Sequence, residues 1–181
     1  MIDLPTLRDL LAEYERALSY TDALWDDLTE EEVYWRPHEN SSAIGWHLGH
    51  QPVVSHFMVR NLTAAEPSID ARFDAMMDGA TAEAQRDPLP PLHLIRSFRD
   101  DVAKRVRFRV GNINRGHVGA PTQLRSIATL MMTSIINHEY QHSKWIGEVR
   151  SDQFGHALPD VPQSDLLTTI DGYVIIDLGS A

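Results

Sequence analysis

The sequence predicts an all-α protein folded as a four-helix bundle. Four long stretches carry apolar residues at a spacing of three or four, which is the period of an amphipathic helix. No comparably long stretch alternates as a strand does, and glycine and proline gather between the helical stretches. The connection between the second and third helices, about 64–91, is long enough for a crossover. We expect one domain over 1–181, with a bundle core at about 4–150 and a short irregular C-terminal tail.

The first helix is predicted over residues 4–28, where leucine, tyrosine and alanine form the apolar stripe. Thr29 is followed by three glutamates, a pattern typical of an N-cap and the acidic first turn of a short helix. Trp35-Arg36-Pro37 should end that segment, because a residue before proline disfavours helical geometry.

The second helix is expected at about 42–62, opened by the capping cluster Asn40-Ser41-Ser42. Pro52 lies inside it and should kink it or split off its first turns. Within the connection that follows, a short helix is plausible at 69–77.

The third helix should begin after Pro91 and run to about Val110, before the glycine-rich stretch that starts at Gly111. Thr122 is then expected to cap the fourth and most regular helix, about 122–150. The tail, 151–181, is predicted to pack on the bundle, and Asp171-Gly172 can form the turn of a small hairpin within 168–178.

Composition excludes several classes of function. The net charge is −10, from 16 Lys and Arg against 26 Asp and Glu, and this field repels nucleic acid and anionic membranes. No apolar run approaches the roughly 20 residues that cross a bilayer, and the N-terminus lacks the pattern of a signal peptide, so a cytoplasmic location is expected. Cysteine is absent while histidine occurs nine times. A transition-metal site here must therefore consist of imidazole and carboxylate groups.

The segment His138-Glu139-Tyr140-Gln141-His142 lies in the middle of the predicted fourth helix. Residues four apart differ by about 40° around a helix, so both histidine rings can reach one ion. The segment also matches the HExxH pattern of zinc proteases, in which Glu139 would be the general base. That alternative needs a third ligand downstream, for which only His156 and Glu148 are close in sequence.

His50 is a better third ligand, because it would face the fourth helix from the second across the bundle. Three imidazoles on facing helices leave coordination positions open for water or substrate, as a catalytic metal requires. His47 lies three residues earlier and can be a fourth ligand, an outer partner of a ligand or a proton relay.

Three segments together resemble the DinB-like superfamily, and the resemblance covers about 4–150. They are Trp35-Arg36-Pro37, the stretch from Asn40 to His50 that ends in Trp46-His47-Leu48-Gly49-His50, and Asn137 to Ile146 with its HxxxH pair. The family implies a four-helix bundle in which His50, His138 and His142 bind one divalent ion, which is zinc, nickel, iron or manganese in different members. The same segments are similar to the N-terminal domain of the sulfoxide synthases of ergothioneine biosynthesis. Lys144 stands where those enzymes have a glutamate, which argues against their oxygen-dependent chemistry.

Other members of the family are transferases and isomerases that use a low-molecular-weight thiol such as mycothiol, bacillithiol or glutathione. The resemblance therefore implies a metal-dependent transferase or hydrolase acting on a small molecule, in which the thiol supplies the nucleophile. The alternatives are a metal-binding bundle without catalysis and a bundle that binds a partner protein. A homodimer is plausible for a bundle of this size.

Two roles near the site stay open at this stage. Glu139 points about 100° away from His138 around the helix, so a salt bridge to a neighbouring helix is as plausible as a catalytic role. Asn137, Gln51 and Gln141 can orient ligand rings through hydrogen bonds.

Overall fold

The computed structural model describes residues 5–36, 38, 41–63, 66–78 and 88–178. Four long helices dominate this part of the chain, which confirms the predicted all-α bundle. They are α1 (Leu7–Ala23), α3 (Ile44–Thr63), α5 (Leu92–Asn114) and α6 (Pro121–Phe154).

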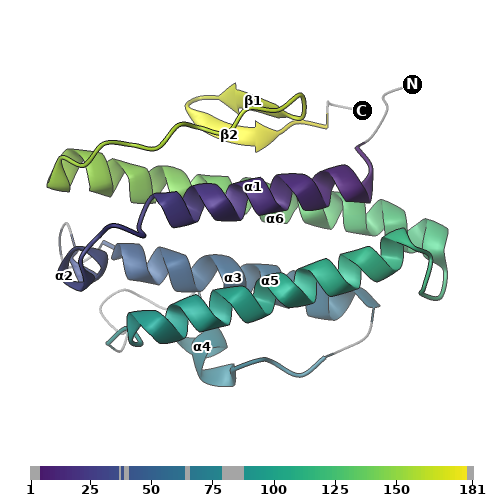
Figure 1. Cartoon of the computed structure of the whole chain (residues 1–181). Helices are drawn as coiled ribbons and strands as arrows, with labels where there is room; N and C mark the ends of the chain where they lie inside the picture. The colour runs from purple at the N-terminus through teal and green to yellow at the C-terminus, as the bar shows by residue number, and fades with distance from the viewer. Residues whose placement is uncertain (1–4, 37, 39–40, 64–65, 79–87, 179–181) are drawn as a thin grey trace.

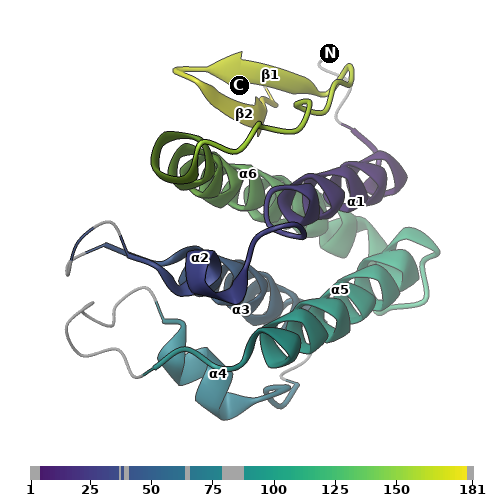
Figure 2. The same cartoon turned by 60° about the vertical axis from the view of Figure 1, so that its left-hand side comes forward.

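The helices form two layers, with α1 beside α6 and α3 beside α5 (Figures 1 and 2). A two-stranded hairpin lies over the outer side of the α1–α6 layer, and the short helix α4 (Ala71–Met76) lies beyond the α3–α5 layer. Leucine, isoleucine, valine and aromatic side chains from all four long helices fill the space between the layers. Among those with no exposed surface are Leu10, Leu48, Ile95, Val102, Met132 and Ile135.

The first two helices begin with a reciprocal cap. Thr6 and Asp9 form a capping box at α1, and Thr29 and Glu32 form another at α2 (Glu30–Tyr34). The short helix predicted after Thr29 is thus confirmed. In contrast, the first helix ends at Ala23, earlier than expected, because residues 24–27 form turns.

The second helix is one continuous element, so Pro52 does not split off its first turns. Asn40, expected in the cap of this helix, lies outside the described residues. Pro37, expected to end the preceding segment, lies outside them as well. The predicted short helix of the connection is α4, capped by the Asp70 side chain.

Other helix ends differ from the predicted ones by a few residues. The third helix continues past Gly111 to Asn114, because the buried Gly111 lies on its packed face. The fourth helix starts at Pro121 rather than after Thr122. Ala120 precedes it in the left-handed conformation with φ 48°, and Pro121 fits the first turn because its missing N–H needs no partner there. The helix ends at Phe154, because the next residue, Gly155, has a φ of 71° that stops the helical path.

The predicted hairpin is present. Strand β1 (Leu167–Ile170) pairs antiparallel with β2 (Tyr173–Ile176), and Ile170 faces Tyr173 across the turn. Both turn residues have positive φ, 52° at Asp171 and 80° at Gly172, as a two-residue hairpin turn requires.

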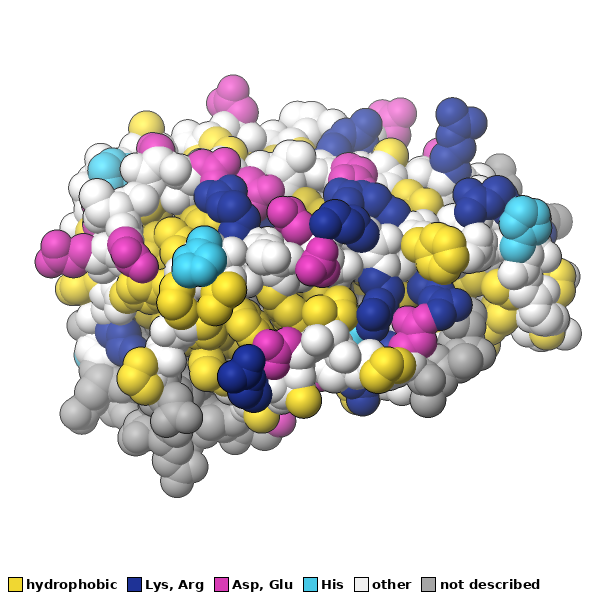
Figure 3. Space-filling view, turned by 60° about the horizontal axis from the view of Figure 1, so that its bottom comes forward, with side chains coloured by type: hydrophobic (Ala, Val, Ile, Leu, Met, Phe, Trp, Pro, Cys, Tyr) yellow, Lys and Arg dark blue, Asp and Glu magenta, His cyan; other side chains and the backbone are white. Residues whose placement is uncertain are grey.

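The side of the molecule at the bottom of Figure 1 shows apolar side chains in a band among charged ones (Figure 3). A cavity of about 380 Å³ lies between α4 and α5, lined by Phe73, Met76, Leu94 and Phe98 among others, and no histidine borders it.

Among the described residues, no helix combines the length and the apolar character that crossing a bilayer demands.

Candidate metal site

The structure brings the three predicted ligands together. His50 comes from α3, whereas His138 and His142 lie one turn apart on α6, and one ring nitrogen of each lies within 4.8 Å of the others. His142 is buried and His138 is half-buried. The facing helices therefore present three imidazoles at one point between the two layers of the bundle.

Hydrogen-bonding contacts fix the direction of these rings. The Nδ1 atom of His50 lies 2.6 Å from the carbonyl oxygen of Met77, which can only accept, so Nδ1 carries the proton and Nε2 keeps its lone pair. The Nε2 atoms of His138 and His142 are 3.0 Å apart, close enough to bind the same ion. An outer carbonyl that sets the tautomer in this way is typical of histidines that bind metals.

His47 contacts the predicted ligand His142 at the ring nitrogen that faces away from His138. Its Nδ1 lies 2.7 Å from Nδ1 of His142, on the opposite side of that ring from His138. When Nε2 of His142 is kept for a metal, its Nδ1–H donates to His47. The structure therefore places His47 as an outer partner of His142, apart from the group of three ligands.

Gly49 explains why the His50–Met77 contact can form. A β-carbon at Gly49 would lie 2.6 Å from Cε and 2.7 Å from Sδ of Met77, closer than van der Waals contact allows. The buried Met77 can thus lie against the backbone of α3, with its carbonyl at the ring of the next residue, His50.

Two tryptophans contact the histidine cluster. Trp46 stacks on the His50 ring, with centroids 4.5 Å apart and planes at 12°. Trp145 meets His142 edge-on at 4.9 Å. These aromatic rings restrict the motion of the ligands and shield them from water.

Burial also sets the protonation of the ligands. It lowers the pKa of His138 to about 4, with a further contribution from His50. Burial lowers the pKa of His142 as well, followed by the charges of His47, His138 and His50. Both rings are therefore neutral at pH 7, the form that binds a metal ion.

These residues fit the predicted divalent ion. Three neutral imidazoles without any sulfur suit zinc, nickel, iron or manganese, and do not choose between them. Within the described ranges, no other histidine, aspartate or glutamate joins the group of three. The downstream ligands of the protease alternative lie elsewhere, because His156 pairs with Glu32 at 2.7 Å and Glu148 pairs with Lys144.

Glu139 belongs to a buried polar network behind the ligands. Its Oε1 accepts hydrogen bonds from Arg99 Nη2 at 3.1 Å and from Thr21 at 2.8 Å. Burial raises the pKa of this carboxyl, and Arg99 and Thr21 oppose the shift. The salt bridge considered from the sequence is therefore present, and the role of Glu139 as a general base stays a prediction.

This network includes the residue that directly follows each of the three histidines in the sequence. Gln51 follows His50, Glu139 follows His138 and Ser143 follows His142. Arg99 donates to the Gln51 side chain at 3.1 Å, the Gln51 amide donates to the Glu139 carbonyl at 3.0 Å, and the Ser143 hydroxyl lies 2.7 Å from that of Thr21. The network ties α1, α3, α5 and α6 together one position away from the metal ligands.

Some of these roles differ from those expected. Gln51 binds the α6 backbone rather than a ligand ring, and Asn137 binds the hairpin. The Asn137 side chain accepts from Ile176 N at 2.7 Å and donates to Ile176 O at 3.1 Å. The roles of Arg99 and Thr21 were not predicted from the sequence. A buried arginine has no sequence pattern that distinguishes it from an arginine on a helix surface.

Cavities adjoin the cluster from both layers. One of about 480 Å³ lies between α6 and the hairpin and includes His138, and another of about 390 Å³ lies along α3 and α4 and includes His50. A small molecule can thus approach the ligands without opening the bundle.

Comparison with known families agrees with this geometry. The family model of the DinB superfamily matches residues 13–146, a range that contains all three histidines and both layers of the bundle. The chain belongs to the DinB superfamily. A search of curated proteins gave no match. The matched range of this DinB protein ends within α6, so the hairpin lies outside it.

Proposed function

We propose that this DinB protein holds one divalent metal ion through His50, His138 and His142 and binds a small molecule at the coordination positions that remain. The observation that supports this is the group of three ring nitrogens within 4.8 Å, which no fourth side chain of the described residues completes. Structural zinc sites normally have four protein ligands, whereas catalytic sites have three and keep one position open. Three ligands therefore favour a site that takes a substrate.

The reaction we propose is a metal-dependent transfer or hydrolysis, with a low-molecular-weight thiol as the nucleophile in the transferase form. A divalent ion held there lowers the pKa of a thiol or water molecule that binds to it, which supplies a nucleophile at neutral pH. The chain has no cysteine, so a sulfur nucleophile has to come from a cosubstrate. The Met77 carbonyl and His47 orient two ligand rings, and Trp46 and Trp145 limit the access of water.

Metal content tests the site itself. We would purify wild type and the double variant His138→Ala, His142→Ala, load both with zinc, nickel, iron or manganese, and measure bound metal after gel filtration. The matched control replaces two exposed histidines, His93→Ala and His117→Ala. The expected result is one ion per chain in wild type and control and almost none in the ligand variant. Equal metal in all three proteins would reject the site.

Turnover tests the reaction. Wild type loaded with each metal would be incubated with glutathione, mycothiol or bacillithiol and a panel of electrophiles, and separately with small esters and amides. We expect consumption of one thiol that stops when the metal is removed. Metal-dependent hydrolysis without thiol consumption would favour the hydrolase form, and metal binding without any turnover would favour the non-catalytic alternative.

A further inference from the structure

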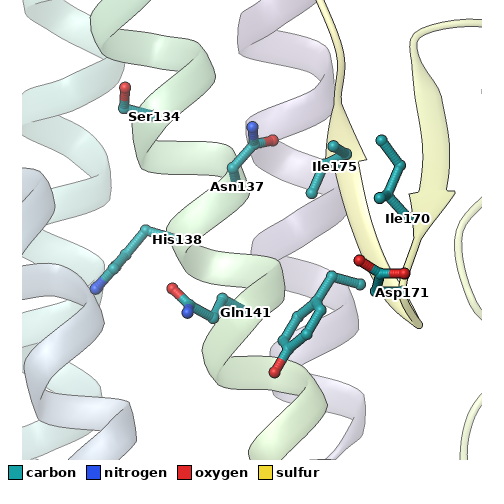
Figure 4. Close-up of a pocket in the computed structure, with 8 residues that line it drawn as sticks. Ser134, Asn137, His138, Gln141, Ile170, Asp171 and Ile175 are labelled. Atoms are coloured by element: carbon teal, nitrogen blue, oxygen red, sulfur yellow. The ribbon is translucent and has the colours of Figure 1, made fainter.

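The cavity beside His138 has walls from two parts of the chain. Helix α6 contributes Ser134, Asn137, His138 and Gln141, and the hairpin contributes Ile170, Asp171, Tyr173 and Ile175 (Figure 4). Figure 4 shows the His138 ring pointing away from the hairpin, toward the neighbouring helix. His138 is thus both a metal ligand and a lining residue, so a molecule in this cavity lies directly beside the metal site.

The lining has one permanent charge. Asp171 carries a carboxylate at the hairpin turn, and no other aspartate, glutamate, lysine or arginine is among the lining residues. Apart from the imidazole of His138, the other lining side chains are an amide, a hydroxyl, a phenol or an aliphatic group. The cavity therefore has the proposed metal-binding histidine on one side and an anionic group on the other.

The Asp171 charge is not compensated by the nearby cation. Lys144 approaches the hairpin with its ammonium 5.1 Å from the centre of the Tyr173 ring, but it pairs with Glu148. Among the described residues, Asp171 forms no ion pair. The net charge of −10 adds a long-range attraction for cations.

We propose that this cavity selects a small molecule with a metal-binding atom at one end and an ammonium or other cationic group at the other. The metal-binding atom lies at the histidine cluster, the cation lies at Asp171, and Ile170 and Ile175 contact the chain between them. Gln141, one helical turn from His138, offers an amide to a polar group on that chain. This inference rests on the proposed function, because it assigns the substrate class of the same site.

Simple thiols test this selectivity. Cobalt-loaded wild type would be titrated with ω-aminothiols of two to six carbons and with ω-hydroxythiols of equal lengths, and the thiolate-to-cobalt absorption band gives each Kd. At the best length we expect the aminothiol to bind about three- to fivefold tighter than its hydroxyl analogue, the range of a partly exposed ion pair. The preference should shrink as salt is added.

Two matched variants locate the charge. Asp171→Asn should abolish the preference and keep the turn, because asparagine tolerates positive φ. Asp165→Asn, an equal charge change at an exposed tail position outside the cavity lining, should retain it.

The outcomes separate this inference from the proposed function. Equal affinities of aminothiols and hydroxythiols in wild type, or a preference that survives in Asp171→Asn, would overturn the cationic substrate and leave thiol binding intact. A cobalt-loaded protein that shows no thiolate band with any compound would overturn both.

Discussion

Arg99 donates a hydrogen bond from Nη2 to Oε1 of Glu139 over 3.1 Å, and the two side chains are only 6% and 2% exposed. This ion pair joins α5 to α6 next to His138, one of the three proposed metal ligands. Removal of one partner would leave a charge in the core without compensation, which is costly even where the intact pair adds little stability.

We therefore expect Arg99→Met to lower the free energy of unfolding by about 3–5 kcal/mol. Urea denaturation of the metal-free protein at pH 7 measures the change. Addition of Glu139→Gln should restore a large part of the loss, because the uncompensated charge is gone. Arg96→Met is the control, since the Arg96–Asp26 pair is about half exposed and should cost less than about 1 kcal/mol. A Glu139→Gln variant with unchanged stability but no turnover would instead support a general base.

His47→Phe tests the outer partner of a ligand. Phenylalanine keeps an aromatic ring beside Trp46 and Trp145 but cannot accept the His142 N–H. We expect metal affinity to fall by about 10- to 100-fold, the usual effect of removing such a partner. Competition with a chelator measures it, with His93→Phe as an exposed control. Complete loss of metal would show that His47 is itself a ligand, and unchanged affinity would show that its contact with His142 does not matter.

His56 should make stability depend on pH. It is buried against Arg105, whose Nη1 lies 2.7 Å from its Nε2, and near Asp74 and Arg60. Burial, followed by Arg105, lowers its pKa below 6.5. As the pH falls through 6.5, the unfolded chain takes up a proton that the folded protein refuses, so stability is present above 6.5 and decreases below it.

The measurement compares metal-free wild type with His56→Gln, which retains an acceptor for Arg105. Between pH 7.5 and 5.5 the variant should lose less free energy of unfolding than wild type. Both proteins keep the other buried histidines, so their difference isolates His56. Parallel pH profiles would contradict the prediction.

Asn137→Ala should loosen the hairpin without disturbing the bundle. The variant loses both hydrogen bonds to the backbone of Ile176, each worth about 0.5–1.5 kcal/mol. We expect hydrogen exchange at the Ile176 amide to accelerate about tenfold or more, and exchange in α3 and α5 to stay unchanged. Ser134→Ala is the control, because that hydroxyl lines the same cavity but bonds within α6. Mass spectrometry of the peptide that contains β2 measures this exchange. Equal exchange rates in wild type and Asn137→Ala would show that Asn137 does not hold the hairpin.

The sequence was informative where a local rule decides the structure. Apolar periodicity identified the four long helices, Thr29 the short one, and Asp171-Gly172 the hairpin turn. The pair His138 and His142 followed from helix geometry alone. The end of the third helix was predicted too early, because the conformational freedom of Gly111 favours a helix end. Gly111 is instead buried within α5, and the helix continues past it. Long-range contacts such as Arg99–Glu139 and His50–Met77 have no local signature, since they depend on how the layers pack.

The Asn137 contact has a consequence for how this protein can diversify. The proposed ligands and the network behind them lie within the bundle, whereas the charged wall of the His138 cavity lies on a hairpin outside the family match. This hairpin packs on the bundle through the buried Ile176 and hydrogen-bonds to the Asn137 side chain of α6. Under the proposed selectivity, substitutions or insertions at the exposed hairpin turn would change the molecule accepted beside the metal and leave the buried Ile176 contact in place. The proposed chemistry and the proposed recognition would in this way belong to separate parts of the chain, which can evolve at different rates.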